Sequence, residues 1–262
     1  AVAQIAPKIE DRGIDEIFVD ATHHTESMQV LAERIKTAVF EATGLTCSIG
    51  GADNKLLAKM ASEVNKPNGI YLWDLQDRTK KLWAMPCKTI PGIGPKTQGR
   101  LHDANIQTVG QLAAMTNDAR NSIFGKKASV WIAKASQGLD DSPIITESEP
   151  VSLSKEITMP RDMDPIHDKN ELTPLFTKLC ASIASELEKK NYTARGVGIK
   201  LKYKDFTQVT RELMLDEPTQ DLRMIRKAAG QALKRAPLNK KIRLMGVKVY
   251  HLEKVNATST LQ

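Results

Sequence analysis

The spacing of hydrophobic residues changes in a fixed order along residues 151–255. Alternating stretches predict strands, and stretches with apolar residues every three or four positions predict helices. The expected elements are a strand near 151–159, a helix near 171–190, strands at 196–204 and 208–215, a helix near 221–235 and a strand near 243–252. The order β-α-β-β-α-β is typical of a split βαβ sheet with two helices on one face.

One of these strands has a regular row of lysines. Apolar residues at 197, 199, 201 and 203 alternate with Gly198, Lys200, Lys202 and Lys204. The period of two places the lysines on the sheet face that the helices leave open. Such a face can lie along a nucleic-acid backbone, although lysines also serve simply to keep an exposed face soluble.

The first half of the chain mixes short strands with helices. We expect a β-hairpin over Lys8–Thr22 with "EDRG" as its turn, then a helix over Ser27–Thr43 that stops at Gly44. A short strand, "LTCSIGG", comes next. A later helical stretch is expected to continue to about Ile145, before a linker.

The stretch "NKLLAKMASEVNKPNG" predicts an amphipathic helix. At about 100° per residue, Leu57, Met60, Ala61 and Val64 fall on one side, and Lys55, Lys59, Ser62 and Lys66 on the other. One face should therefore pack, while the other offers three ammonium groups. Pro67 and Gly69 place Lys66 at the helix end.

The stretch "GIDEIFVD" places two acids beside an apolar run. A buried charge is costly unless it is paired, so Asp15 and Glu16 either lie at a turn in water or hold a cation. In a regular strand, neighbouring side chains point to opposite faces. The two acids can serve one site only at a strand end or bend, which Gly13 favours.

The stretch "IPGIGPKTQGRL" has the strongest local signal. Gly92 and Gly94 permit a tight turn with outward amides, Pro95 suits the first turn of a helix, and Lys96 adds a positive charge. A helix N-terminus with free amides binds anions. The pattern predicts a helix-hairpin-helix that holds DNA phosphates without reading bases; a plain packing corner is the alternative.

Charge is unevenly distributed along the 262 residues. The formal net charge is +7, and residues 151–255 hold 21 Lys and Arg against 13 Asp and Glu, whereas residues 1–150 hold 17 against 18. A basic C-terminal part is expected if it binds a polyanion, although a solvated basic surface without a partner is equally open.

The three cysteines, Cys47, Cys87 and Cys180, are isolated. Isolated cysteines favour a reducing cytoplasm and argue against a zinc cluster. No apolar stretch approaches the roughly 18 residues that suggest a membrane span, so we expect a cytoplasmic protein without a membrane partner.

Taken together, these motifs resemble the Y-family translesion DNA polymerases, most closely the DNA polymerase IV branch. The resemblance covers about residues 5–255 and also rests on "ARGVGIKLKYKDF". It implies an α+β fold made of a partial palm, a thumb with the helix-hairpin-helix, a linker, a β-α-β-β-α-β little finger and a tail, at residues 1–73, 74–145, 146–150, 151–255 and 256–262.

The resemblance also implies roles for single residues. Asp15 would be a metal ligand, Glu16 a catalytic carboxylate and metal ligand, and Lys66 a contact to the incoming nucleotide's triphosphate. DNA would be held by the amides of Gly92 and Gly94 and by the side chains of Lys96, Lys200, Lys202 and Lys204.

The implied partners are primer–template DNA, an incoming dNTP and two Mg²⁺ ions, which suit carboxylate ligands. Family members often bind a sliding clamp, but "NATSTLQ" shows no clear clamp-binding peptide.

Two features depart from the family pattern. The family places a further catalytic aspartate and the fingers upstream of "GIDEIFVD", and here only about a dozen residues precede that motif. We therefore expect residues 1–262 alone to bind primer–template DNA without extending it. In "GGADNK", Asp53 opposes phosphate binding and makes Lys55 a doubtful contact.

Two other functions remain open from the sequence. One is a DNA-binding fragment or relative without catalysis. The other is a nuclease or glycosylase, which would use the same hairpin and acids but would cleave DNA or release a base.

Overall fold

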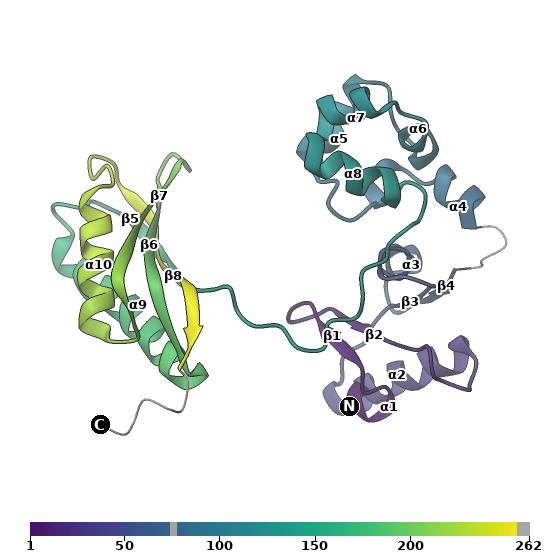
Figure 1. Cartoon of the computed structure of the whole chain (residues 1–262), viewed down its shortest axis with the longest axis horizontal. Coiled ribbons are helices and arrows are strands. Elements are labelled where there is room, and N and C mark those ends of the chain that lie inside the picture. Colours follow the sequence, from purple (N-terminus) through teal and green to yellow (C-terminus); the bar gives the residue numbers. More distant parts are fainter. Residues whose placement is uncertain (74–77, 256–262) are drawn as a thin grey trace. The chain divides into compact units, whose positions relative to one another are not determined.

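The computed structural model describes residues 1–73 and 78–255. The chain forms two compact units, unit 1 over Ala1–Ser148 and unit 2 over Glu149–Gln262 (Figure 1). The mixture of helices and strands confirms the predicted α+β class. The start of the expected thumb (74–77) and the expected tail (256–262) lie outside the described residues.

Unit 1 begins with a small layer of helices and a hairpin. Its elements are α1 (Val2–Ile5), β1 (Ile9–Asp11), β2 (Ile17–Val19) and α2 (Met28–Thr43). Ser27 caps α2 by accepting a hydrogen bond from the Val30 amide, and Gly44 ends it with a left-handed φ of 71°. The predicted hairpin and helix are therefore present.

The predicted turn of this hairpin was wrong. Glu10 and Asp11 belong to β1, and Asp11 pairs with Ile17 of β2. The chain reverses between Arg12 and Glu16, where the Arg12 amide donates to the Glu16 carbonyl at 3.0 Å. Gly13 supplies the reversal with a φ of +149°, a conformation that glycine adopts readily. "EDRG" was misread because Glu10, although charged and buried, is paired with Lys55 and the Ile145 amide and can therefore stand in a strand.

The next part of unit 1 is a parallel βαβ unit followed by helices. Its elements are β3 (Ile49–Gly51), α3 (Lys55–Val64), β4 (Ile70–Leu72), α4 (Arg78–Ala84), the 3₁₀ helix η1 (Cys87–Thr89), α5 (Pro95–Asp103), α6 (Val109–Ala113), α7 (Asn117–Phe124) and α8 (Lys126–Ala135). One apolar core joins α3 to the later helices through Leu57, Met60, Leu82, Leu101, Leu112 and Ile132, all at most 2% exposed.

The helical stretch ends earlier than the sequence suggested. Helix α8 stops at Ala135, and Gly138 has a φ of +72°. Residues 139–145, which were expected to be helical, are not. They run back over the start of α3, where Asp140 accepts a hydrogen bond from the Leu56 amide at 3.0 Å. Tertiary contacts to α3 replace the helix here.

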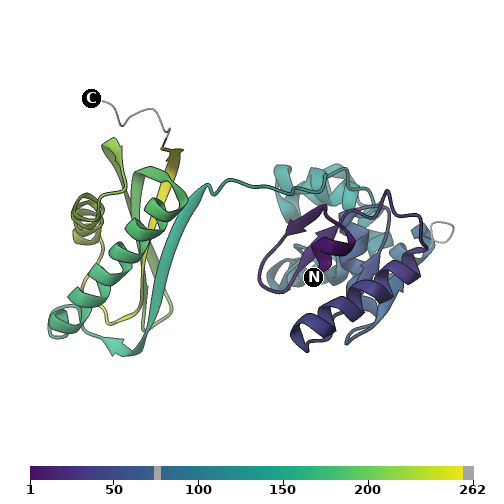
Figure 2. The ribbon, with the colours of Figure 1, turned by 90° about the horizontal axis from the view of Figure 1, so that it is seen from below.

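Unit 2 is the predicted β-α-β-β-α-β unit. Its elements are β5 (Ser152–Met163), α9 (Lys169–Lys190), β6 (Tyr192–Tyr203), β7 (Gln208–Thr219), α10 (Leu222–Lys234) and β8 (Ile242–Lys254). The antiparallel sheet has the order β5-β8-β6-β7. Strands β5 and β6, joined by α9, have β8 between them. Strands β7 and β8, joined by α10, have β6 between them. This order confirms the split βαβ arrangement. Both helices cover one face (Figures 1 and 2).

The strands are longer than predicted. β7 runs to Thr219 through Pro218, which lacks an amide hydrogen. Because β7 is an edge strand, it tolerates a proline that a central strand would exclude.

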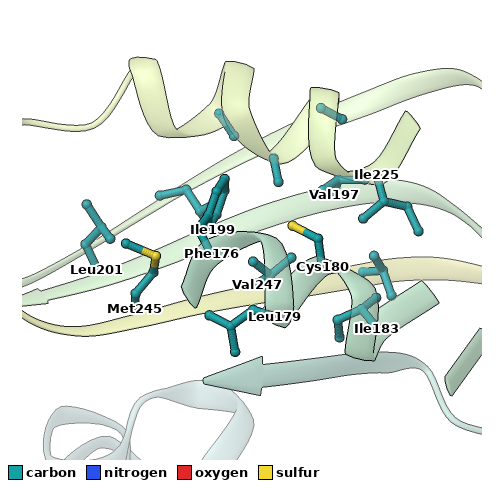
Figure 3. Packing of buried hydrophobic residues seen from close by; sticks show 14 of the residues in the cluster. Phe176, Leu179, Cys180, Ile183, Val197, Ile199, Leu201, Ile225, Met245 and Val247 are labelled. Carbon is teal, nitrogen blue, oxygen red and sulfur yellow. The ribbon is translucent and has the colours of Figure 1, made fainter. Parts of the chain in front are cut away.

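The core of unit 2 lies between the sheet and the two helices (Figure 3). Helix α9 contributes residues such as Phe176, Cys180 and Ile183, while β6 contributes the odd-numbered residues from Val197 to Tyr203, which are at most 4% exposed. The alternation predicted from the sequence is therefore confirmed. No helix within residues 1–73 and 78–255 has the length and apolarity to cross a bilayer.

Candidate functional site

The tip of the β1–β2 hairpin carries Asp15 and Glu16. The structure places both acids at the bend just before β2, where Ile14 beside them is fully exposed. Asp15 is exposed and has no ion pair within the described part of the chain. The two carboxylates are thus free of the strand geometry that would point them apart; Asp15 faces solvent, and Glu16 is half-buried.

An alternating row of charges connects this tip to the end of α3. Lys59 Nζ lies 2.7 Å from Glu16 Oε2 and 3.1 Å from Glu63 Oε1, and Lys66 Nζ lies 2.7 Å from the same Glu63 oxygen. The hydrogen bond from Lys66, with that from Lys59, lowers the pKa of Glu63 against the opposing effect of burial. We call Glu16, Lys59, Glu63 and Lys66 the charge row.

The predicted lysine face of α3 is therefore correct in position but not free. Lys55, Lys59 and Lys66 are all paired with carboxylates. On the opposite side, Leu57, Met60 and Ala61 are buried as expected, whereas Val64 is 42% exposed. Val64 was misassigned because it is the last residue of α3, where its side chain is only partly covered.

A buried carboxylate that sequence reasoning missed secures the base of the hairpin. Glu10 in β1 is 3% exposed. Its Oε2 accepts hydrogen bonds from Lys55 Nζ at 2.6 Å and from the Ile145 amide at 2.9 Å. Lys55 also donates to the carbonyl of Pro143 at 3.0 Å. Residues 138–145, which we call the return segment, are thereby tied to the hairpin, and Lys55 is not available to a phosphate.

The Glu10 cluster has a defined pH dependence. Burial alone raises the pKa of Glu10, but the hydrogen bonds from Lys55 and the Ile145 amide outweigh it and lower the pKa below its ordinary value. The stabilisation is present above the ordinary carboxyl range and is lost as pH falls through the lowered value.

Replacing Glu10 with alanine is expected to destabilise unit 1 by about 3–5 kcal/mol, because it leaves the Lys55 ammonium, whose side chain is only 14% exposed, without its carboxylate partner. All three tryptophans, Trp73, Trp83 and Trp131, lie in unit 1, so their fluorescence during urea unfolding reports this unit alone. Glu41→Ala, an exposed site on α2, should change stability by less than about 0.5 kcal/mol. Equal, small effects of both variants would contradict the assigned role of Glu10.

The loop before α5 has the backbone geometry that the predicted anion site requires. Gly92 has a φ of +92° and Gly94 is the N-cap of α5, with Pro95 at its first position. Ile93 between the glycines is 6% exposed and anchors the loop in the core. The amides of Gly94 and Lys96 have no acceptor within the described residues, and space around Gly94 is open. The element before the loop is the short η1 and not a full helix.

The open face of the unit 2 sheet bears the predicted lysines. Lys200 and Lys202 lie on it, and Lys204 follows the end of β6. Lys200 Nζ lies 2.9 Å from Glu156 Oε2 on β5, so part of its charge is neutralised. Lys248 on β8 was not predicted; it pairs with Gly198 across the sheet and shares this face. Alternation in "MGVKVY" was the signal that could have found it.

Asp15 and Glu16 were expected to hold a metal ion. Within residues 1–73 and 78–255, no cluster of three or more His, Cys, Asp or Glu side chains could hold a metal ion. Asp15 and Glu16 provide two carboxylates, the donor type that hard divalent cations prefer.

Comparison with known proteins places these features in a family. The family model described as "impB/mucB/samB family" matches residues 1–63, the model of that family's C-terminal domain matches 150–261, and the model "DNA polymerase-iota, thumb domain" matches 88–140. The thumb match covers the loop before α5 and therefore supports the helix-hairpin-helix.

Curated relatives are DNA polymerases IV. That of Nitrosopumilus maritimus is 34% identical over 247 residues, which cover 92% of this chain and 67% of the relative. That of Streptomyces coelicolor is 32% identical, with 94% of this chain and 52% of the relative covered. That of Neisseria meningitidis is 31% identical, with 97% and 72% covered. The chain thus spans between about half and about seven tenths of these relatives' length.

Solved structures share the fold. A Y-family DNA polymerase chimera, Dbh-Dpo4(243-245)-Dbh, superposes with a TM-score of 0.83 at 23% identity and covers 97% of this chain and 74% of its own. The insertion ternary complex of Dbh DNA polymerase gives a TM-score of 0.65 at 23% identity, again covering 97% and 74%. The chain belongs to the Y-family of DNA polymerases, in the group that includes DNA polymerase IV.

Proposed function

We propose that the protein takes part in template-directed nucleotidyl transfer during DNA damage bypass, as a divalent-metal-dependent DNA polymerase that uses Mg²⁺. The observation that carries the proposal is the neighbouring pair of exposed Asp15 and half-buried Glu16 at a bend of unit 1, in a chain related to DNA polymerases IV. The β2 strand and Gly13 hold the pair at the surface, where a substrate can reach it.

Asp15 and Glu16 would hold the metal in this reaction. A bound divalent ion makes the primer 3′-hydroxyl more acidic and neutralises charge on the pyrophosphate leaving group. The two carboxylates supply oxygen ligands and negative charge at the surface, and two Mg²⁺ ions remain the family expectation. Glu16 must exchange its contact with Lys59 for the metal.

The charge row gives Lys66 a role in nucleotide binding. Its ammonium is half-exposed and is held by Glu63. A triphosphate carries more negative charge than one carboxylate, so it can draw Lys66 away from Glu63. When Lys66 moves to the triphosphate and Glu16 moves to the metal, Lys59 and Glu63 remain paired with each other. Lys66 therefore binds and orients the phosphates, and the charges of the two remaining members of the charge row still cancel.

Two surfaces would hold primer–template DNA. The amides of Gly92 and Gly94 and the side chain of Lys96 suit a phosphate at the start of α5. In unit 2, Lys200 and Lys202, continued by Lys204, suit a run of backbone phosphates. Both contacts are independent of base sequence, as a polymerase that moves along DNA requires.

The resemblance to Y-family DNA polymerases supports a division into palm (1–73), thumb (74–145), linker (146–150) and little finger (151–255). The three free cysteines favour a cytoplasmic location. A sliding-clamp partner remains an expectation drawn from the family.

Primer extension by the natural gene product tests the proposed function. With Mg²⁺ and all four dNTPs, we expect addition of nucleotides complementary to the template. Cleavage of the strand or release of a base would contradict it.

A further inference from the structure

An exposed aromatic ring occupies the turn between β6 and β7. Phe206 is 60% exposed, and its backbone is left-handed with a φ of 63°. The Tyr203 amide donates to the Thr207 carbonyl, and the Phe206 amide donates to the Tyr203 carbonyl, both at 2.9 Å. In short hairpin turns of this kind, the left-handed position is usually glycine. A bulky residue there is strained, and such strain is typical of functional sites.

The turn does not need the ring for its own stability. Asp205 accepts hydrogen bonds from the Thr207 amide at 3.0 Å and from Lys240 Nζ at 2.7 Å. Lys240 and Thr207 together lower the pKa of Asp205 to about 2, so the carboxylate stays charged and keeps the turn closed at neutral pH. The aromatic side chain is therefore an addition to a turn that is already fixed.

Two cations lie over the ring. Lys202 Nζ lies 4.9 Å and the Arg243 guanidinium carbon 4.7 Å from the centroid of Phe206. Cations at this distance are attracted by the ring's electron-rich face. Lys204 and Lys241 lie next to each other at the same end of the sheet, where the Lys204 amide donates to the Lys241 carbonyl. The exposed ring thus stands in a strongly basic neighbourhood.

We propose that Phe206 is a stacking site for an unpaired DNA base, which replaces a cation on the ring face, so that Lys202 and Arg243 turn to the adjoining phosphates. Proteins that bind single strands combine cations with exposed aromatic rings in this way. A base inside a duplex has both faces covered by its neighbours, so the ring can take an unpaired base, and in a duplex only the outer face of an end pair is open. The inference rests on the proposed function, in that unit 2 binds DNA, and it adds the single-stranded template as a ligand.

The test uses Phe206→Gly, because glycine suits the left-handed turn and the variant should fold at least as well as the wild type. Affinity is measured for a labelled oligothymidylate and for a blunt duplex by fluorescence anisotropy. We expect about a tenfold loss for the oligothymidylate and less than about a twofold change for the duplex. Phe206→Trp, which keeps a ring, should retain single-strand affinity.

Ile166→Ala is the matched control, since Ile166 is an apolar side chain 72% exposed in the same unit and has no aromatic ring. It should leave both affinities unchanged. An equal loss for single strand and duplex in Phe206→Gly would overturn the inference, because the ring would then only position Lys202 and Arg243. Unchanged affinities would overturn it as well. If the wild type binds neither DNA, the proposed function itself fails.

Discussion

Replacing Glu16 with glutamine in the natural gene product is expected to lower primer extension by about three orders of magnitude, while duplex affinity stays within about twofold. Glutamine keeps the shape of the side chain but removes the negative charge that a divalent ion requires. Metal ions stabilise the transition state of such reactions by several kcal/mol, and about 1.4 kcal/mol corresponds to a factor of ten in rate.

The position of Glu16 explains why its replacement should lower primer extension but not the affinity for duplex DNA. It stands at the hairpin tip, and its contact is with Lys59 of α3, whereas the proposed DNA contacts come from the loop before α5 and from unit 2. The control is Glu41→Gln on the exposed side of α2, which should retain full activity. Normal extension by Glu16→Gln, or a parallel loss of DNA affinity, would contradict the assigned role.

Binding to duplex DNA should depend steeply on salt. If the lysines and the loop before α5 make about 6–10 phosphate contacts, affinity should fall about 10³–10⁵-fold between 50 and 200 mM salt. Replacing Lys200, Lys202 and Lys204 with alanine should reduce the slope of log K against log salt by as much as about 2.7, because each lost contact removes about 0.9. The contribution of Lys200 should be the smallest, since Glu156 already holds it.

A triple variant on the helix-covered side is the matched control. Lys178 of α9 and Lys227 and Lys234 of α10 are exposed, and their replacement lowers the net charge by the same amount. This variant should keep the wild-type slope, as measured by anisotropy over the same salt range. Equal slopes for the two triple variants would show that net charge, and not the open sheet face, attracts DNA.

The elements that could be predicted are those whose residues are close in sequence. The alternation from Val197 to Tyr203 depends only on the pleat of one strand, and it placed the lysines of β6 correctly. The βαββαβ order followed in the same way. Glycine and proline marked the loop before α5, because their backbone preferences act locally.

The features that could not be predicted depend on distant partners. Glu10 and the Ile145 amide are 135 positions apart, so no local pattern connects the hairpin to the return segment. The same contacts explain why residues 139–145 are not helical and why "EDRG" is not the turn. Lys59 likewise pairs with Glu16, 43 positions away. This distant contact is why the lysine face of α3, predicted to be free, belongs to the charge row.

The most direct test of the proposed activity is primer extension with the natural gene product on a primed template, with each dNTP offered singly and with Mg²⁺ either present or chelated. The account predicts that only the nucleotide complementary to the first unpaired template base is added, and only when the metal is present. DNA binding without incorporation, or incorporation that ignores the template base or survives chelation, would contradict it.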